Sequence, residues 1–212
     1  MPPKVKFQKE EIVDAALRIA RRSGIDAVTA REVASELKVS PRPIFTWFAS
    51  MEELRHEVYE RAKERYLAHI RLGLEEPIPF LGMCRQYLLF AREEPMLYRL
   101  LFLTPPGQIS GGAMEALRYS QVLARPSLMR IYRMDADTAD KYFRDLWLVA
   151  FSFATLIVTD DSPYSDAEML AIGTEFSIAI CKAYKEIPGF AEGSYDRDAI
   201  FRALVGGQET EA

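Results

Sequence analysis

The fold is decided by residues 28–54, VTAREVASELKVSPRPIFTWFASMEEL, where signals for helix starts follow one another closely. Thr29 stands three residues before Glu32, which is the spacing of a capping box at the first turn of a helix. Ser40 and Pro41 give a second signal, because a capping hydroxyl is followed by the residue that best tolerates the first helical position. Two short helices joined by a brief connection make a helix-turn-helix.

Amphipathic helices are expected on both sides of this pair. Upstream, Gly24 ends a helix whose apolar residues recur at the spacing of a single stripe, namely Ile12, Ala15, Ala16, Ile19 and Ala20. Downstream, Ser50 and Glu53 repeat the capping-box spacing and begin a long helix that runs to about Leu72. The upstream stripe would hold the helix-turn-helix at a fixed angle through a small core.

Helical periodicity also dominates the rest of the chain, and no alternation typical of strands is found. Further helices are expected at residues 79–94, 95–103, 112–134, 135–159, 165–185 and 195–205. Pro126 should bend or split the third of these. We therefore predict an all-α fold with an N-terminal three-helix helix-turn-helix domain at residues 1–50 and a C-terminal helical bundle at residues 51–212.

Charge divides the chain in the same place. The whole chain carries −4, but residues 1–50 carry +3 and the remainder therefore carries −7. A mildly basic part on an acidic remainder suits a local contact with DNA and excludes a protein that coats nucleic acid along its whole surface.

The sequence does not indicate export or membrane insertion. Cys84 and Cys181 sit in apolar stretches and are expected to be free thiols in a reducing compartment. The most apolar segment, residues 146–158, is shorter than the roughly 20 residues that a membrane-spanning helix needs. No apolar run of the signal-peptide type follows Met1. We expect a cytoplasmic protein that has no membrane partner.

The second helix of the motif should present a polar face. Ile44, Phe45 and Phe48 are expected to turn inward, which leaves Arg42, Pro43, Thr46 and Trp47 outward. Arginine pairs with guanine through two hydrogen bonds, and hydroxyl groups and helix N-termini bind phosphates. The residues expected to contact double-stranded DNA are Lys4, Lys6, Thr29, Arg31, Ser40, Arg42, Pro43, Thr46, Trp47 and Ser50.

Residues 12–54 resemble the DNA-binding domain of the TetR family of bacterial repressors. The resemblance is carried by VTAREVA at 28–34, LKVS at 37–40, IFTWF at 44–48 and SMEEL at 50–54. The later part of the chain is more loosely similar to the ligand-binding domains of that family. The resemblance implies a homodimer that binds a palindromic operator, acts as a repressor and is released by a small-molecule effector.

Four positions depart from the family's pattern. The family usually has Tyr and Lys, both phosphate contacts, where this chain has Phe45 and Met51. Arg42 and Pro43 replace a small residue and a threonine. Losing two phosphate contacts should weaken DNA binding and flatten its salt dependence. One alternative therefore stays open: an all-α ligand-binding or adaptor protein with weakened DNA binding.

Residues 80–158 are rich in aromatic and methionine side chains. Such residues usually form an ordinary core, but together they also suit a cavity for an apolar or aromatic ligand. The residues expected to bind this small molecule are Met83, Tyr87, Phe90, Tyr98, Phe102, Met114, Tyr119, Phe143, Trp147 and Phe151.

The last two long helices carry more apolar surface than one face needs. Small residues among large ones would let these helices approach their copies in a four-helix interface, which a homodimer uses. The residues expected there are Ala154, Ile157, Val158, Met169, Ile172, Gly173, Phe176 and Ile180. A buried helix pair in a monomer is the alternative.

The sequence offers little for catalysis or metal binding. His56 and His69 fall on one expected helix, about 140° apart, so they cannot share a metal ion. Glu52, His56 and Glu60 lie at i, i+4 and i+8, which is more typical of a solvated face than of a divalent-ion site. Neither a glycine-rich dinucleotide motif nor a phosphate-binding loop occurs. We expect no enzymatic activity, no cofactor and no metal.

Overall fold

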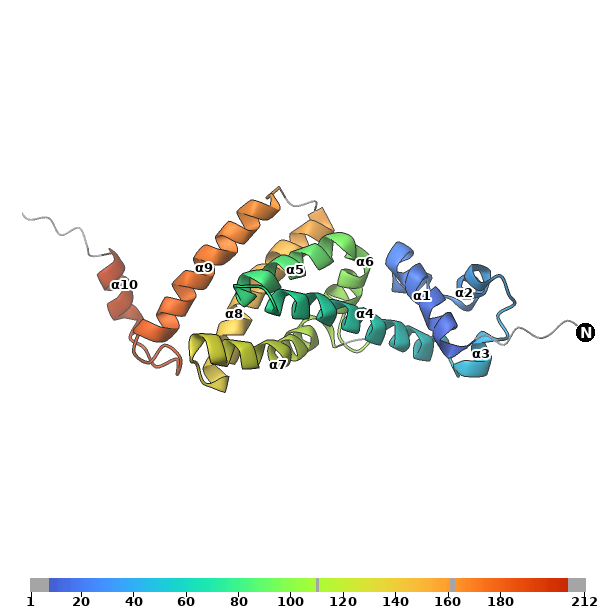
Figure 1. The fold of residues 1–212 in the computed structure, drawn as a ribbon, viewed down its shortest axis with the longest axis horizontal. Helices are drawn as coiled ribbons and strands as arrows, with labels where there is room; N and C mark the ends of the chain where they lie inside the picture. The colour runs from blue at the N-terminus through green and yellow to red at the C-terminus, as the bar shows by residue number, and fades with distance from the viewer. Residues whose placement is uncertain (1–7, 110, 161–162, 206–212) are drawn as a thin grey trace, which may run out of the picture.

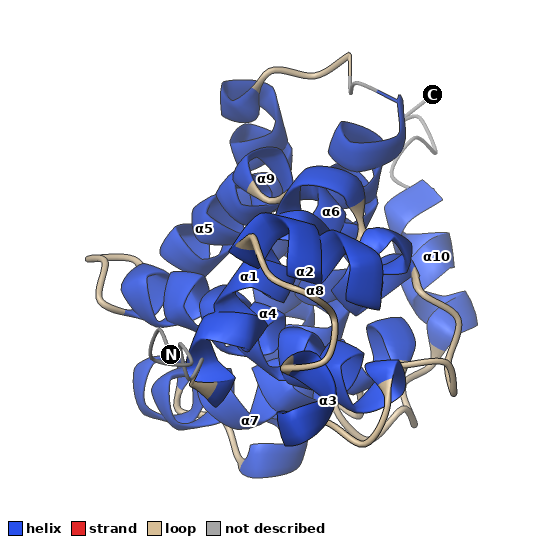
Figure 2. Cartoon of the chain, turned by 90° about the vertical axis from the view of Figure 1, so that its right-hand side faces the viewer, coloured by secondary structure: helices blue, strands red, loops and turns tan. Residues whose placement is uncertain are grey.

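The structure, a computed structural model, describes residues 8–109, 111–160 and 163–205. In these ranges every regular element is helical (Figures 1 and 2), so the predicted all-α fold is confirmed. The first elements are α1 (Lys9–Ser23), η1 (Ile25–Ala27), α2 (Ala30–Leu37), α3 (Ile44–Trp47), α4 (Met51–Leu74) and α5 (Pro79–Glu93). They are followed by α6 (Pro95–Tyr98), η2 (Arg99–Leu103), α7 (Gly112–Tyr132), α8 (Ala136–Asp160), α9 (Asp166–Glu186) and α10 (Arg197–Val205).

The helices α1–α3 form a small unit, here called the head, at one end of an elongated molecule (Figure 1). Gly24 ends α1 with a φ of 83°, a conformation that side chains rarely adopt. Thr29 begins α2, because its hydroxyl accepts a hydrogen bond from the Glu32 amide. The core of the head consists of Ile12, Val13, Ala15, Ala16, Ile19, Ala20, Val28, Val33, Ala34, Ile44 and Phe48.

The second helix of the helix-turn-helix is shorter than predicted. It contains only Ile44–Trp47, and the connection from α2 runs from residue 38 to residue 43. Pro43, not Ser40, precedes the helix, and it provides no side-chain cap. The two prolines explain the difference: neither has an amide hydrogen, and each disfavours the helical conformation in the residue before it, which includes Arg42. The prediction of a helix at 41–48 capped by Ser40 was wrong.

The helices α4–α9 form a bundle, here called the body, and α10, which has no buried residue, lies at its far end (Figure 1). Helices α4 and α5 cross closely because Gly73 faces Gly82: a Cβ atom on Gly73 would lie 2.5 Å from the carbonyl carbon of Gly82. Helix α5 also packs on α8, and α8 packs on α7 and α9. Pro126 lies within α7, which it does not split. The predicted helix at 95–103 is present as α6 followed by η2, a π-helix.

Helix α8 explains the most apolar stretch of the sequence. Of the described helices, it alone is long and apolar enough to cross a membrane by length and composition, a test that the core helix of a bundle also passes. Here it contacts α5, α7 and α9. Its apolar composition is thus accounted for by its central place in the body.

Candidate functional site

The segment around α3 gives the head an exposed surface. Of the outward residues predicted there, the structure exposes Arg42, Thr46 and Trp47 and half-buries Pro43. Phe45 was expected inside, but it is 51% exposed. Ile44 and Phe48, one helical turn apart, fill the inner side, and Phe45 lies about 100° around the helix from Ile44. Such a short helix buries only one narrow face, so the inward placement of Phe45 was wrong.

Two hydroxyl groups predicted to contact DNA cap helices. Thr29 Oγ1 accepts a hydrogen bond from the Glu32 amide, and Ser50 Oγ accepts one from the Glu53 amide, both at 3.2 Å. Each marks a helix N-terminus, whose partial positive charge attracts phosphate. Of the remaining predicted contacts, the structure exposes Arg31 and Ser40, whereas Lys4 and Lys6 lie outside the described residues.

The body contains a small cavity between α4, α5 and α8. Its volume is about 30 Å³, which is room for a single water molecule. It is lined by Tyr66, Ile70, Phe80, Met83, Cys84, Tyr87, Phe143, Leu146, Trp147 and Ala150. Sequence reasoning named four of these residues, Met83, Tyr87, Phe143 and Trp147. It missed Tyr66 and Ile70, which stand one turn apart on α4, because that helix was treated only as a connector.

An aromatic cluster surrounds Tyr66 beside the cavity. Its ring meets those of Tyr87, Phe90, Phe102 and Tyr119 edge to face, with centroids 5.1–6.0 Å apart. The predicted ligand residues Phe90, Tyr98, Phe102 and Tyr119 belong to this cluster or border it, and they do not line the cavity. Burial raises the pKa of Tyr87 well above its usual value, so its hydroxyl is neutral.

Two further predicted ligand residues lie apart from the cavity lining. Met114 of α7 is 57% exposed and is not part of the cavity lining. Phe151 is half-buried and stacks on Trp147, with ring centroids 5.0 Å apart. Phe151 therefore packs against Trp147 in the cavity wall without lining the cavity itself.

Three buried polar atoms of the described residues have no hydrogen-bond partner: Tyr87 Oη, Tyr119 Oη and Trp147 Nε1. The neighbouring hydroxyls differ, because Tyr66 bonds to Ser120 Oγ and Tyr98 to Thr155 Oγ1, both at 3.0 Å. A buried donor without a partner costs about 1–3 kcal/mol. Such groups beside a cavity are candidates for contact with a ligand.

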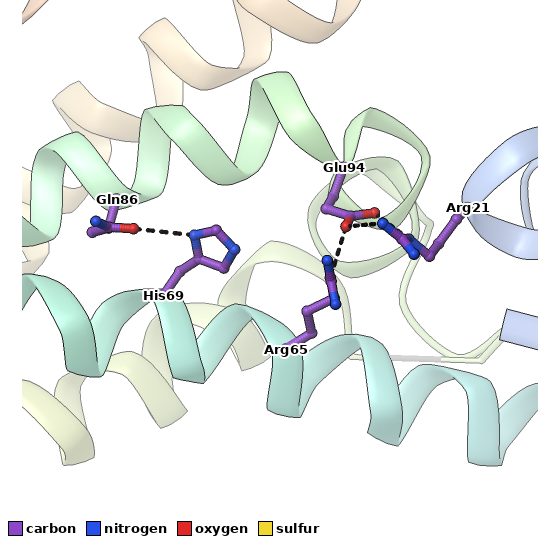
Figure 3. A network of polar contacts seen from close by, with 5 residues as sticks. All are labelled: Arg21, Arg65, His69, Gln86 and Glu94. Carbon is purple, nitrogen blue, oxygen red and sulfur yellow. Dashed lines mark hydrogen bonds and ion pairs between the residues drawn. The ribbon is translucent and has the colours of Figure 1, made fainter. Parts of the chain in front are cut away.

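A buried carboxylate joins the head to the body (Figure 3). Glu94, between α5 and α6, is 3% exposed. Arg21 of α1 donates to it through Nε and Nη2 at 2.7 and 2.6 Å, and Arg65 of α4 donates through Nε at 2.7 Å. The hydrogen bond from Arg21 to Glu94 raises the pKa of Arg21, so Arg21 keeps its charge. Farther along α4, His69 Nδ1 lies 3.2 Å from Gln86 Oε1 of α5 (Figure 3).

The helices α8 and α9 expose apolar side chains. The exposed ones include Leu148, Ile172, Phe176 and Ile178, and Ile157, Val158 and Ile180 are half-buried. Ala154, Met169 and Gly173, however, are buried within the chain, so their assignment to a dimer interface was wrong. Gly173 faces α5, since a Cβ atom there would lie 3.6 Å from Cys84 Sγ.

Metal ligands are not gathered anywhere in the described ranges: no three His, Cys, Asp or Glu side chains are placed to share an ion. His56 stacks on Tyr59, with ring centroids 6.1 Å apart. The candidate functional site therefore consists of two parts, the exposed surface of the head and the apolar cavity of the body.

Known proteins share these features. Residues 12–58, from α1 into the first part of α4, match the bacterial regulatory proteins of the tetR family. No protein of curated function matches the chain. Structures of the multidrug binding protein EbrR have the same fold: the complex with malachite green gives a TM-score of 0.57 and 23% identity over 82% of this chain and 98% of that one. The imidazole complex gives 0.55 and 21% over 79% and 93%.

A transcriptional regulator from Rhodococcus sp. Rha1 is also similar, with a TM-score of 0.55 and 14% identity over 83% of this chain and 96% of that one. These likenesses show a common fold, and the family match covers residues 12–58. The head of this chain therefore matches the helix-turn-helix segment of the tetR family of bacterial regulatory proteins, and the chain as a whole shares the all-helical fold of these structures.

Proposed function

We propose that the protein is a homodimeric repressor that binds a palindromic operator through its head and releases it when a small apolar or aromatic effector enters the body. The observation that carries this proposal is the double role of α4. Leu54 and Val58 are fully buried in the part of α4 that packs on α1. Tyr66 and Ile70, farther along the same helix, line the cavity. A shift of α4 in the body therefore moves the head.

The size of the cavity supports this coupling. Pockets that hold small molecules commonly measure about 300–1,000 Å³, and this one measures about 30 Å³. An effector therefore enters only by displacing the lining helices, α4 among them. Effector and DNA then favour different arrangements of one protein, which is a population shift with reciprocal coupling.

Glu94 supports a second route for the same signal. It begins α6, because its carbonyl accepts a hydrogen bond from the Tyr98 amide at 2.8 Å. The Tyr98 hydroxyl in turn bonds to Thr155 Oγ1 on α8. Other residues of α8 line the cavity. Movement around the cavity is thus passed through α6 to Glu94 and on to Arg21 in the head.

The two-fold arrangement is supported by the apolar face of α8 and α9, where Ile172 and Phe176 are exposed. Two recognition helices related by a two-fold axis read half-sites about 34–36 Å apart or a multiple of this. EbrR, which was crystallised in complexes with malachite green and with imidazole, supports a small-molecule ligand for a protein of this fold. We expect the protein to act in the cytoplasm.

A gel shift on the DNA upstream of its own gene, at two salt concentrations, tests the proposal. Arg42→Ala should weaken specific binding by roughly 5- to 150-fold, the value of one bidentate base contact. Arg118→Ala, an exposed arginine on α7, should leave binding unchanged.

A second experiment tests the dimer. Phe176→Glu should give a monomer by sedimentation and lose operator binding, whereas Leu72→Glu, exposed on α4, should not. Retained binding by Arg42→Ala, or a monomeric wild type, would contradict the proposal.

A further inference from the structure

We propose that the cavity takes a neutral, mainly aromatic ligand that carries a hydrogen-bond acceptor, and that Tyr87 Oη and Trp147 Nε1 donate to that acceptor. The inference rests on the proposed function, since it gives a ligand class to the same cavity. It is drawn from the polar groups in the cavity wall, their partners and their charge.

Two residues of the cavity wall carry unpaired donors, which lie behind the apolar surface of the cavity and are reached when an effector displaces the lining. Tyr87 and Trp147 both line the cavity and are 2% and 5% exposed. Neither polar atom has a hydrogen-bond partner within the described part of the chain. An indole N–H can only donate, so Trp147 requires an acceptor. A ligand that brings one satisfies a group that the fold leaves unpaired.

The hydroxyls of Tyr98 and Tyr66 lie near the two donors, and their electrostatic influence reaches Tyr87 and Trp147. Neither hydroxyl forms a hydrogen bond of normal geometry with these donors. They form hydrogen bonds of normal geometry to Thr155 Oγ1 and Ser120 Oγ, both at 3.0 Å. A ligand acceptor placed between them would give the two donors a better partner.

The wall carries no charge that would bind an ion. Its residues are aromatic and aliphatic apart from the Cys84 thiol, whose pKa is raised to about 11 by burial, so it stays protonated. The buried carboxylate of the body, Glu94, is not part of the lining and is already paired with Arg21 and Arg65. A charged ligand would lose its hydration without gaining a counter-charge.

Neighbouring rings cover part of the aromatic surface of the wall. Tyr66 and Tyr87 meet edge to face at 82°, and Tyr87 and Trp147 meet at 69°. Phe151 stacks on one face of the indole at 16°. A cation held by an aromatic ring needs an open ring face, and one face of Trp147 is already covered.

Three probes separate the ligand classes. Benzophenone and diphenylmethane have nearly the same shape, but only the first has a carbonyl acceptor; proflavin is a cationic aromatic dye. Calorimetry on the full-length protein without DNA should give benzophenone about tenfold tighter binding than diphenylmethane, the value of one buried hydrogen bond. Proflavin should bind more weakly than benzophenone.

Substitutions assign the donors. In Tyr87→Phe and Trp147→Phe, checked for fold by circular dichroism, the preference for benzophenone should fall at least threefold. Tyr184→Phe is the matched control, because its hydroxyl bonds to Asp145 on the far side of α8 from the cavity lining, and it should keep the full preference.

Equal binding of benzophenone and diphenylmethane to the wild type would overturn the role of the donors. Tighter binding of proflavin would overturn the neutral class, and failure of all three probes would overturn the assignment. The gel shift tests DNA binding separately from these measurements. If the protein bound its operator but not benzophenone, the proposed ligand class would be wrong and the proposed DNA binding would stand.

Discussion

The head and the body have cores of different composition. The head packs small aliphatic side chains from α1 and α2, with Phe48 as its one fully buried aromatic residue. The body packs Tyr66, Tyr87 and Trp147 around a cavity, with Phe102 against all three rings. The three buried polar atoms without partners among the described residues all belong to the body.

This difference indicates how the two parts divide the work. A close-packed aliphatic core resists rearrangement, because any displacement opens space or forces overlap. A core with spare volume and unpaired donors has incomplete contacts, so it gains free energy when a ligand fills it. The head is therefore suited to hold one shape against DNA, and the body to change shape when occupied.

The largest expected effect compares one deletion in each core. Ile44→Ala should lower the free energy of unfolding of the head by about 4 kcal/mol, because Ile44 is fully enclosed. Ile70→Ala should cost about 2 kcal/mol, because Ile70 already faces the cavity and loses fewer contacts. Urea denaturation followed by circular dichroism measures both. Equal losses would contradict the comparison of the two cores.

The next effect concerns the carboxylate that joins the two parts. With Glu94 intact, saturating benzophenone should weaken operator binding about tenfold or more, within the usual range of coupling energies. In Glu94→Ala, Arg21 and Arg65 lose their common partner, so the change should fall below about twofold. Fluorescence anisotropy with labelled operator, with and without benzophenone, measures it.

Glu93→Ala is the control for that experiment, since Glu93 is the exposed neighbour of Glu94. It should retain the full response. If Glu94→Ala also retained it, the signal would travel through α4 alone.

A smaller effect separates paired from unpaired hydroxyls in the body. Tyr87→Phe removes a buried hydroxyl without a partner and should raise stability by about 1 kcal/mol, or roughly 2–4 °C in Tm. Tyr66→Phe removes a hydroxyl bonded to Ser120 and should lower stability by a similar amount. Opposite signs in calorimetry are expected; a loss in both variants would show that Tyr87 has a partner.

Helix positions were predictable wherever the signal was local. Gly24, Thr29 and Ser50 end or begin helices as expected, because each acts on the backbone within one turn. The late start of α3 was missed although its cause is equally local. Pro41 and Pro43 together shorten the helix more than a single proline in the first turn would.

The site in the body was less predictable because its parts are distant in sequence. Glu94 meets partners 73 and 29 residues away, and nothing beside it in the sequence distinguishes it from Glu93. Helix α8 and α9 were rightly seen as apolar, but periodicity does not tell which face turns inward. Met169 and Gly173 were therefore placed at an interface although they face the core.

The smallest expected effect tests whether the head surface meets DNA at Phe45. The TetR family usually has tyrosine there, and the ring is 51% exposed, so Phe45→Tyr adds a hydroxyl at the surface without disturbing the core. One added hydrogen bond to a phosphate should tighten operator binding by about 2- to 10-fold. The slope of affinity against salt should stay the same, because no cation is added.

Phe48→Tyr is the matched control: its ring is buried, so the hydroxyl should destabilise the head instead. An unchanged affinity in Phe45→Tyr would mean that this ring does not face the backbone of DNA, and it would favour an adaptor role in which the exposed ring meets a protein.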